Sequence, residues 1–168
     1  MFRYNAYFGI HTVYYMDLGA HTRKQPLPMP AIILAAVKKG ENALNAWTKN
    51  LFDKLDNLKF LVYFTEEGFP SLVPVIQSQS AGTQHLIFAP GAFTRELKAI
   101  PKGVPMALFG LSLDMTDVLT RGIYQGIRWV GPHRCGVLKV DWVYNSMPPV
   151  PQQIYPPLPL ELIREFEL

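Results

Sequence analysis

The segment from Gly91 to Lys98 combines residue types that bind phosphate groups. Gly91 permits a tight turn, Thr94 is a candidate N-cap or phosphate donor, and Arg95 and Lys98 carry positive charge. A guanidinium can bond two phosphate oxygens at once, and a short helix adds the positive end of its dipole. The same residues also form the pattern of an ordinary capped helix with basic side chains, so both interpretations stay open.

A second polar group follows an apolar segment. Gln77-Ser78-Gln79-Ser80 comes directly after Val73-Pro74-Val75-Ile76. Amide and hydroxyl groups can both donate and accept hydrogen bonds, so they are candidates for ligand contacts. On the residues alone, the pattern is that of a polar strand end that enters a hairpin.

The remaining candidates for chemistry form no recognisable motif. The histidines lack the spacing of metal ligands: His11, His21, His85 and His133. Cys135 is the single cysteine, so we predict no metal site and no internal disulfide. Glu66 and Glu67 fall in a predicted turn, where solvated carboxylates are ordinary. The glycine motifs of nucleophile elbows, dinucleotide sites and phosphate loops are absent.

The composition indicates a folded chain that forms a single domain over residues 1–168, with 49% hydrophobic and only 17% charged residues. The net charge of +3 suits a phosphorylated small molecule. No basic stripe with interleaved aromatic residues predicts a nucleic-acid partner. The longest apolar run, residues 31–37, is too short to cross a membrane. With no signal peptide pattern and a lone cysteine, we expect a cytoplasmic protein.

Residues 58–145 are predicted to form the core of the fold. Apolar, β-rich runs alternate with turn residues there, and a short basic helix interrupts them. The predicted strands are residues 58–65, 69–77, 85–89, 104–113, 117–129 and 135–144, with turns at 66–68 and 80–83 and the helix at 91–98.

Two further patterns refine these strands. Gly122 and Gly126 mark a bulge or a close backbone approach within one strand. In the last strand, alternate residues are expected on two faces, one buried and one partly solvated: Val137, Lys139, Asp141 and Val143 against Leu138, Val140, Trp142 and Tyr144.

The flanking regions are residues 1–57 and 146–168. Residues 10–16 are predicted as a strand, 19–30 as a loop and 31–39 as either a helix or a strand. A helix is predicted over 41–57, starting near Gly40, with an apolar stripe that includes the core residue Trp47: Leu44, Trp47, Leu51 and Leu55. Residues 147–159 contain six prolines, which predicts an extended surface segment without strand or helix, before a last helical turn at 160–166.

This order of elements resembles the FMN-binding split β-barrel family, which includes pyridoxamine 5'-phosphate oxidase. The resemblance implies a mainly β fold, a split β-barrel of the FMN-binding type with flanking helices. Val73-Pro74-Val75 is similar to the Val-Pro-Val that many members carry beside the flavin. The positions that follow, Ile76, Gln77 and Ser78, are thereby expected to face the isoalloxazine ring.

The resemblance also implies phosphate ligands. Thr94-Arg95 is similar to the hydroxyl-basic pair of the family, Leu97 to its leucine and Ile100-Pro101 to its Asn-Pro, while Lys98 adds charge. When Pro101 is aligned with the family proline, however, the expected Ser-Arg-Lys positions hold Gly91-Ala92-Phe93.

Two residues of the fifth and longest predicted strand complete the expected site. Arg121-Gly122 resembles a basic-Gly pair of the family, and Arg121 is expected to reach the phosphate or the partner subunit. Trp129 is expected to cover the ring, or to be a core or interface tryptophan.

The function that the resemblance implies is an FMN-dependent oxidoreductase acting on a small-molecule substrate. The expected assembly is a homodimer with the cofactor at the subunit interface, because an isolated barrel with so many apolar strands would expose a large patch. A deazaflavin or haem is the alternative cofactor. The alternative functions are a non-catalytic flavin- or haem-binding module and a cofactor-free β-barrel interaction protein.

Overall fold

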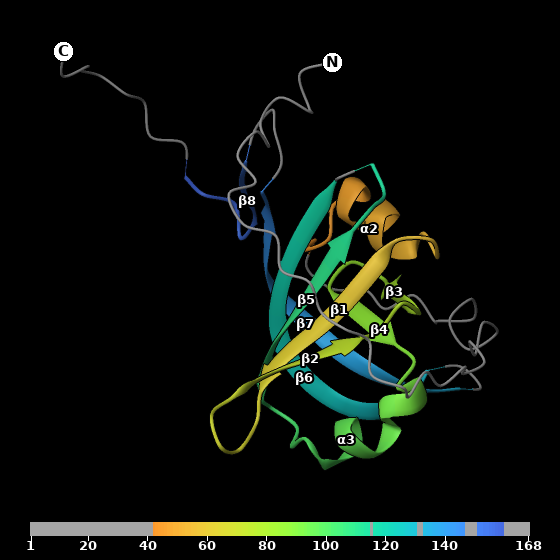
Figure 1. Cartoon of the computed structure of the whole chain (residues 1–168). Helices are drawn as coiled ribbons and strands as arrows, with labels where there is room; N and C mark the ends of the chain where they lie inside the picture. Colours follow the sequence, from red (N-terminus) through yellow and green to blue (C-terminus); the bar gives the residue numbers. More distant parts are fainter. Residues whose placement is uncertain (1–41, 115, 131–132, 147–150, 160–168) are drawn as a thin grey trace, which may run out of the picture.

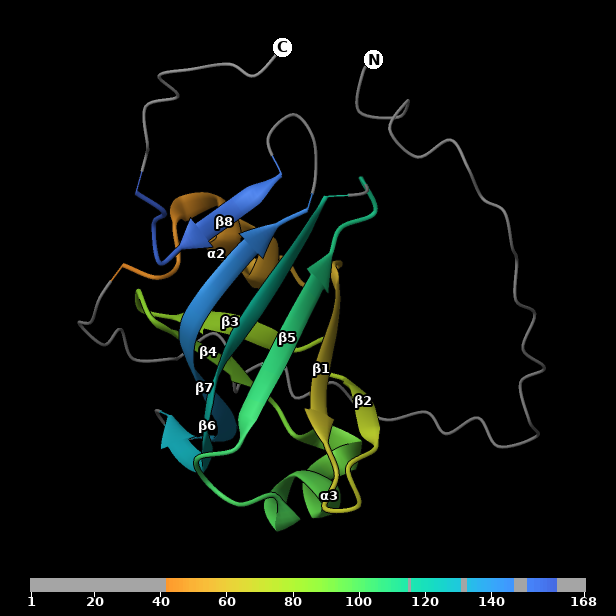
Figure 2. The same cartoon turned by 90° about the vertical axis from the view of Figure 1, so that its left-hand side faces the viewer.

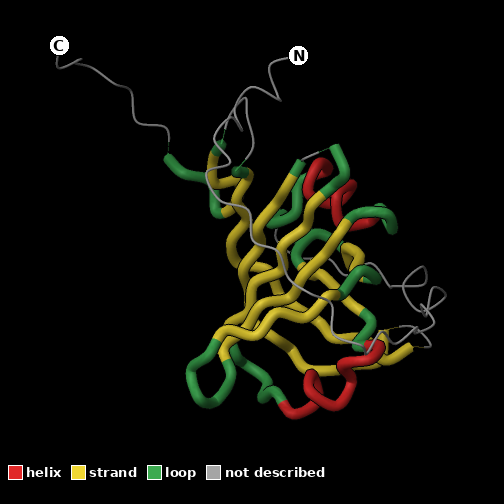
Figure 3. The backbone as a smooth tube through the Cα atoms, in the orientation of Figure 1, coloured by secondary structure: helices red, strands yellow, loops and turns green. Residues whose placement is uncertain are grey.

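The computed structural model describes residues 42–114, 116–130, 133–146 and 151–159. Strands dominate this part of the chain, and the helices α2 and α3 lie at opposite ends of the sheet (Figures 1 and 3). The elements in chain order are α2 (Ala46–Asp53), β1 (Leu58–Phe64), β2 (Pro70–Pro74), β3 (Ser78–Ala81), β4 (His85–Phe88), the 3-10 turn η2 (Gly91–Phe93), α3 (Thr94–Ala99), β5 (Pro105–Leu111), β6 (Asp117–Val130), β7 (His133–Asn145) and β8 (Gln152–Tyr155).

The sheet curls on itself. Neighbouring strands are antiparallel in the order β2-β1-β5-β6-β7-β4-β3, with β8 added to β7 (Figure 2). The two outer strands, β2 and β3, are nevertheless joined by residues 75–77 alone. A flat sheet of this width would hold its edges about 29 Å apart, whereas the connection reaches at most about 14 Å. The edges must therefore approach each other. The expected mainly β, barrel-type fold with flanking helices is confirmed, with its seam between β2 and β3.

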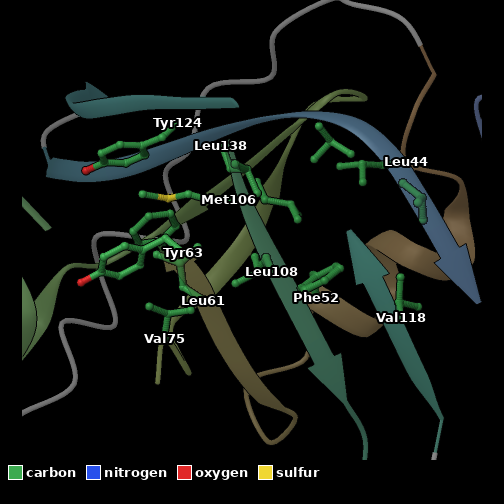
Figure 4. Packing of buried hydrophobic residues seen from close by; sticks show 14 of the residues in the cluster. Leu44, Phe52, Leu61, Tyr63, Val75, Met106, Leu108, Val118, Tyr124 and Leu138 are labelled. Atoms are coloured by element: carbon green, nitrogen blue, oxygen red, sulfur yellow. The ribbon is translucent and has the colours of Figure 1, made fainter. Parts of the chain in front are cut away.

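Alternate residues of the long strands fill the interior of the barrel. On β1 the burial alternates, so Lys59, Leu61 and Tyr63 point inward. Phe52 of α2 and Leu97 of α3 are fully buried at the two ends. Side chains of the other strands complete the same cluster (Figure 4): Met106, Leu108, Val118, Tyr124 and Leu138. Each large apolar side chain buried in this way stabilises the fold by about 1.5–3 kcal/mol.

Helix α2 is shorter than the helix predicted over residues 41–57. The side chain of Asn45 accepts a hydrogen bond from the Thr48 amide at 2.8 Å and caps the helix at its first turn. Leu51 is buried as predicted, but Leu55 lies beyond the helix and is 40% exposed. The predicted start near Gly40 and the inclusion of Leu55 are wrong, because the Asn45 cap and the turn into β1 bound the helix.

The two glycines singled out in β6 do have special positions. A Cβ on Gly122 would lie 2.1 Å from the carbonyl oxygen of Lys139 on β7, so only glycine allows this approach. Gly126 has a φ of +79°, which disfavours other residues. The β6–β7 register shifts beside both of them. The prediction of a bulge or close approach is confirmed.

Two strands were not predicted. The run 69–77 ends as a strand at Pro74, and the polar residues that follow form the separate strand β3, which pairs with β4. The proline-rich segment 147–159 was expected to contain no strand, but Gln152–Tyr155 forms β8 on the edge of β7. Prolines cannot donate to a ladder, yet Pro151 and Pro156 only flank the paired residues. Residues 1–41 and 160–168, with their predicted elements, lie outside the described residues.

A bulge changes which side of β7 faces the core. Arg121 of β6 pairs with Trp142, but the next residue, Gly122, pairs with Val140, so Asp141 has no partner in the ladder. The expected alternation therefore fails after Asp141. Val143 is fully buried, although Lys139 and Asp141, which belong to the same alternating set, are exposed.

Among the described residues, no helix has the length and apolar character needed to cross a membrane.

Candidate functional site

The outer face of the barrel carries continuous apolar rows. In one row, Leu72 of β2 lies opposite Val62 of β1, Val62 opposite Ala107 of β5, and Ala107 opposite Arg121 of β6. A neighbouring row joins Pro74, Phe60, Phe109 and Leu119. We call the seven apolar residues of these rows, together with Phe64, the outer apolar face. Leu72 and Phe64 are 61% and 68% exposed on it.

A pocket of about 390 Å³ opens on this face, between β1, β5 and β6. We call it the outer pocket. Its walls are largely apolar, with Val62, Ala107 and Ile123 among them. Arg121 and Asp141 supply its charges. Pockets of about 300–1,000 Å³ with apolar walls and a few polar groups are typical of small-molecule sites.

Arg121 is held in place by an aromatic stack. Its guanidinium carbon lies 4.2 Å from the centre of the Trp142 ring. Trp142 in turn stacks on Tyr144, with ring centres 5.5 Å apart, and its Nε1 donates to Gln153 Oε1 of β8 at 2.8 Å. A guanidinium positioned in this way still has free N–H groups for an anion. Of the predicted phosphate ligands, Arg121 alone lines the outer pocket.

The predicted phosphate ligands of the basic helix lie elsewhere. Thr94 Oγ1 donates to the Gly91 carbonyl at 2.7 Å. The N-cap position belongs to Phe93 and has no side-chain hydrogen bond, so the predicted capping role of Thr94 is wrong. Arg95 and Lys98 are exposed and line neither of the two pockets beside β1. Of the three predicted basic residues, Arg121 alone lines either of these pockets.

The Val-Pro-Val segment exposes its proline and buries both valines. Val73 and Val75 are 3% and 1% exposed and belong to the core. Pro74 and Ile76 are exposed. A molecule bound along β2 would contact these two side chains and would not reach the two valines.

Gln77 and Ser78 are buried polar residues at the seam. Ser78 is fully buried and its hydroxyl has no hydrogen-bond partner. Gln77 is 7% exposed, and its backbone carbonyl accepts a hydrogen bond from the Ala89 amide at 3.0 Å. An unsatisfied buried hydroxyl such as that of Ser78 costs about 1–3 kcal/mol. The seam beside β3 is therefore a second place where a ligand group or a small rearrangement would lower the free energy.

Trp129 stands apart from these groups. It lies near the end of β6, opposite Arg134 of β7, and is 71% exposed. It lines neither pocket beside β1, and it is not a core tryptophan. Two predicted roles are left for Trp129, to cover the flavin ring or to lie in a subunit interface. Both require that a second chain reaches it.

Lys59 was not among the residues predicted for a site. Its side chain is fully buried, and its Nζ donates to the carbonyls of Lys54 and Ile76, the latter at 3.1 Å. Burial lowers its pKa to about 8, against the opposing effect of Asp53 and Asp56. Lys59 thus ties the end of α2 to the seam. The one feature of the sequence that could have indicated a buried amine is a lysine at an inward-facing position of an apolar strand.

A second pocket was not predicted from the sequence. It has a volume of about 420 Å³ and lies between the β1–β2 turn and α3. We call it the end pocket. Glu66 and Glu67 line it from the turn and Glu96 lines it from the helix. The sequence places the turn carboxylates in solvent, and no local pattern connects them with a residue about thirty positions later.

No protein-family model matches the sequence, and no curated protein matches it. Several solved structures are similar over part of the chain. HupZ of Group A Streptococcus has a TM-score of 0.49 at 13% identity, covering 62% of this chain and 95% of its own. An F420 reductase has a TM-score of 0.42 at 14% identity, covering 56% and 94%.

A third structure, from Lactobacillus delbrueckii, is of a protein proposed to be a pyridoxamine 5'-phosphate oxidase. Its TM-score is 0.44 at 20% identity, and the match covers 61% of this chain and 94% of that one. A likeness of this degree concerns the course of the backbone and does not extend to ligands.

Proposed function

We propose that the protein is a homodimeric FMN-binding flavoprotein with oxidoreductase activity toward a small molecule. The observation that carries the proposal is the outer pocket, an apolar cavity of about 390 Å³ with a guanidinium fixed at its wall. An apolar wall suits the flat face of a ring system, and a positioned arginine suits its phosphate.

The outer apolar face supports a dimer. Phe64 and Leu72 are more than half exposed on it, at 68% and 61%. Contiguous exposed apolar surface of this kind marks an interaction site. A two-fold dimer uses the same patch on both copies, so the outer pocket would lie at or near the interface. In such an assembly α3 and the seam of the partner subunit would supply the remaining contacts.

The chain's own residues would hold and orient the cofactor. Arg121 would bind the phosphate, Val62 and Ala107 would pack against the ring, and Gln77 would offer its amide to a ring edge. The flavin, when bound, supplies hydride transfer. Among the described residues that line the outer pocket, Asp141 is the one acidic group. The partner subunit would cover the pocket and exclude water from it.

The test compares FMN retention in two arginine variants. R121A is expected to raise the dissociation constant of FMN about tenfold or more, because a charged hydrogen bond is lost. R128A is the matched control, since Arg128 lies on the same strand, is exposed and bonds only to Gln125 among the described residues. Absorption between 300 and 500 nm after gel filtration, with and without added FMN, gives the readout.

Three results would distinguish the alternatives. Flavin bands that stay with the wild-type protein and decline in R121A support the proposal. Retained FMN that no nicotinamide donor reduces would leave a non-catalytic binding module. A colourless protein after addition of FMN would contradict flavin binding.

A cofactor-free interaction protein is the second candidate function. The observation in its favour is the dispersion of the predicted phosphate ligands, with Arg95 and Lys98 outside the pocket that contains Arg121. This function predicts a colourless protein in which the outer apolar face still binds a partner chain.

A further inference from the structure

We propose that the end pocket binds a small organic cation, an ammonium group carried on an apolar body. The end pocket adjoins the outer pocket and shares Tyr63 and Phe64 with it, but its carboxylates Glu66, Glu67 and Glu96 line the end pocket alone. The pocket has a volume of about 420 Å³, within the range of small-molecule sites.

The charge of the end pocket is negative although the chain is basic. The carboxylates of Glu66, Glu67 and Glu96 line it, and no lysine or arginine from the described ranges does. The whole chain has a net charge of +3. None of the three carboxylates forms a salt bridge within the described residues. A hydrogen bond from Thr65 lowers the pKa of Glu67, which keeps that carboxylate ionised at neutral pH.

Tyr63 provides an independent sign of a ligand. Its side chain is only 9% exposed, yet it lines the end pocket, and its hydroxyl has no hydrogen-bond partner among the described residues. In Figure 4 this hydroxyl points away from the core, on the same side as the Tyr124 hydroxyl, which donates to the Leu97 carbonyl of α3 at 3.0 Å. This hydroxyl reaches the surface of the pocket and is available to an N–H donor.

The rest of the wall is apolar. Phe64 and Tyr63 contribute aromatic rings from β1, and Ile100, Pro101 and Val104 contribute aliphatic surface from the segment after α3. An ammonium group gains from carboxylates and from aromatic faces together. An inorganic cation would use only the former, so the walls select an organic cation with a hydrophobic body.

The experiment uses three probes of similar shape on the full chain. They are 2-phenylethylammonium, the neutral 2-phenylethanol and the anionic 3-phenylpropionate. Binding is followed by amide NMR shifts, which are expected for residues 63–67 and 96–104. The cation is expected to bind at least about tenfold more tightly than the alcohol, and the anion is expected not to bind.

Variants locate the site. E96Q should weaken binding of the cation about two- to fivefold, as one exposed charge pair is lost, and the triple variant E66Q/E67Q/E96Q should weaken it more than tenfold. Y63F should weaken it about three- to tenfold. The control D114N changes an exposed carboxylate on the β5–β6 turn, outside the pocket, and should bind as the wild type does.

The comparison of probes on the wild-type protein tests the proposal even if a variant does not fold. Equal affinity for the cation and the alcohol would overturn it, because the carboxylates would then have no role. Shifts confined to other parts of the chain, or no binding of the cation at all, would overturn it as well. The carboxylate variants distinguish this site from the flavin site, because Glu66, Glu67 and Glu96 line the end pocket and not the outer pocket.

Discussion

The buried amine of Lys59 predicts an unusual dependence of stability on pH. Its pKa in the folded chain is lowered to about 8 from 10.5, chiefly by burial. Between these two values the unfolded chain holds a proton that the folded chain has released, so the free energy of unfolding rises with pH over this window. The rise is expected to reach about 1–3 kcal/mol. Below pH 8 both states are protonated and this contribution is constant.

K59M removes the titrating group and two hydrogen bonds. Urea unfolding of the wild type and K59M at several pH values from 6.5 to 10.5 measures the difference in free energy of unfolding. This difference should be constant below pH 8 and should then move in favour of the wild type. A difference that stays flat across the whole range would show that Lys59 does not titrate in the window.

At the residue scale, the sequence identifies candidate site residues but does not show which of them lie close together in the fold. Arg121 was predicted as a site residue and lines the outer pocket. Arg95 and Lys98 were predicted as phosphate ligands on the same grounds, but they are exposed and lie outside this pocket. The difference depends on which residues the register brings together across strands. Lys59 shows the same limit, since its acceptors belong to Lys54 and Ile76, on either side of it in sequence.

The pairing of β6 with β7 depends on the absence of a side chain at Gly122. A Cβ there would lie 2.1 Å from a backbone oxygen that cannot rotate away. We expect G122A to reduce the free energy of unfolding by about 2 kcal/mol or more, because the strands must separate locally. Urea or thermal unfolding monitored by circular dichroism measures the effect.

G68A is the matched control for G122A. Gly68 has a φ of +82° in the β1–β2 turn, with open space around its Cβ position. Alanine there meets only backbone strain, expected to cost about 1 kcal/mol. If G122A were no more destabilising than G68A, the close approach of the two strands would be ruled out as a constraint.

At the element scale, strongly apolar strands were predictable and weakly patterned ones were not. The runs that became β1, β5 and β6 are apolar enough for their burial to be read from sequence. In contrast, β3 is polar and β8 lies between prolines, so both owe their conformation to pairing with a neighbouring strand. The residues of β7 that face the core change at the bulge at Asp141. This bulge depends on the pairing with β6 as well as on the residues of β7.

At the scale of the whole molecule, the barrel was foreseeable because the order of strands and helix constrains the fold. The outer apolar face was foreseeable only in general terms, as an excess of apolar strand surface. Its location follows from the registers of β2, β1, β5 and β6, which align Leu72, Val62 and Ala107 in one row. Such a row on the outside of a barrel stays exposed unless another chain covers it.

The dimer proposed for this face is tested by L72E. Leu72 is 61% exposed on β2, so glutamate there should leave the fold intact. In a two-fold interface, however, each copy would bury one new carboxylate, and an unpaired buried charge is strongly unfavourable. L72E is therefore expected to be monomeric by light scattering after gel filtration at concentrations where the wild type is dimeric, and to retain less FMN.

L113E is the control for L72E, because Leu113 is 78% exposed in the β5–β6 turn and lies outside the outer apolar face. It should assemble as the wild type does, while circular dichroism should show all three proteins folded. A wild-type monomer, or an L72E dimer as stable as that of L113E, would place the subunit contact elsewhere. Either result would also remove the physical reason for a cofactor site shared between two outer pockets.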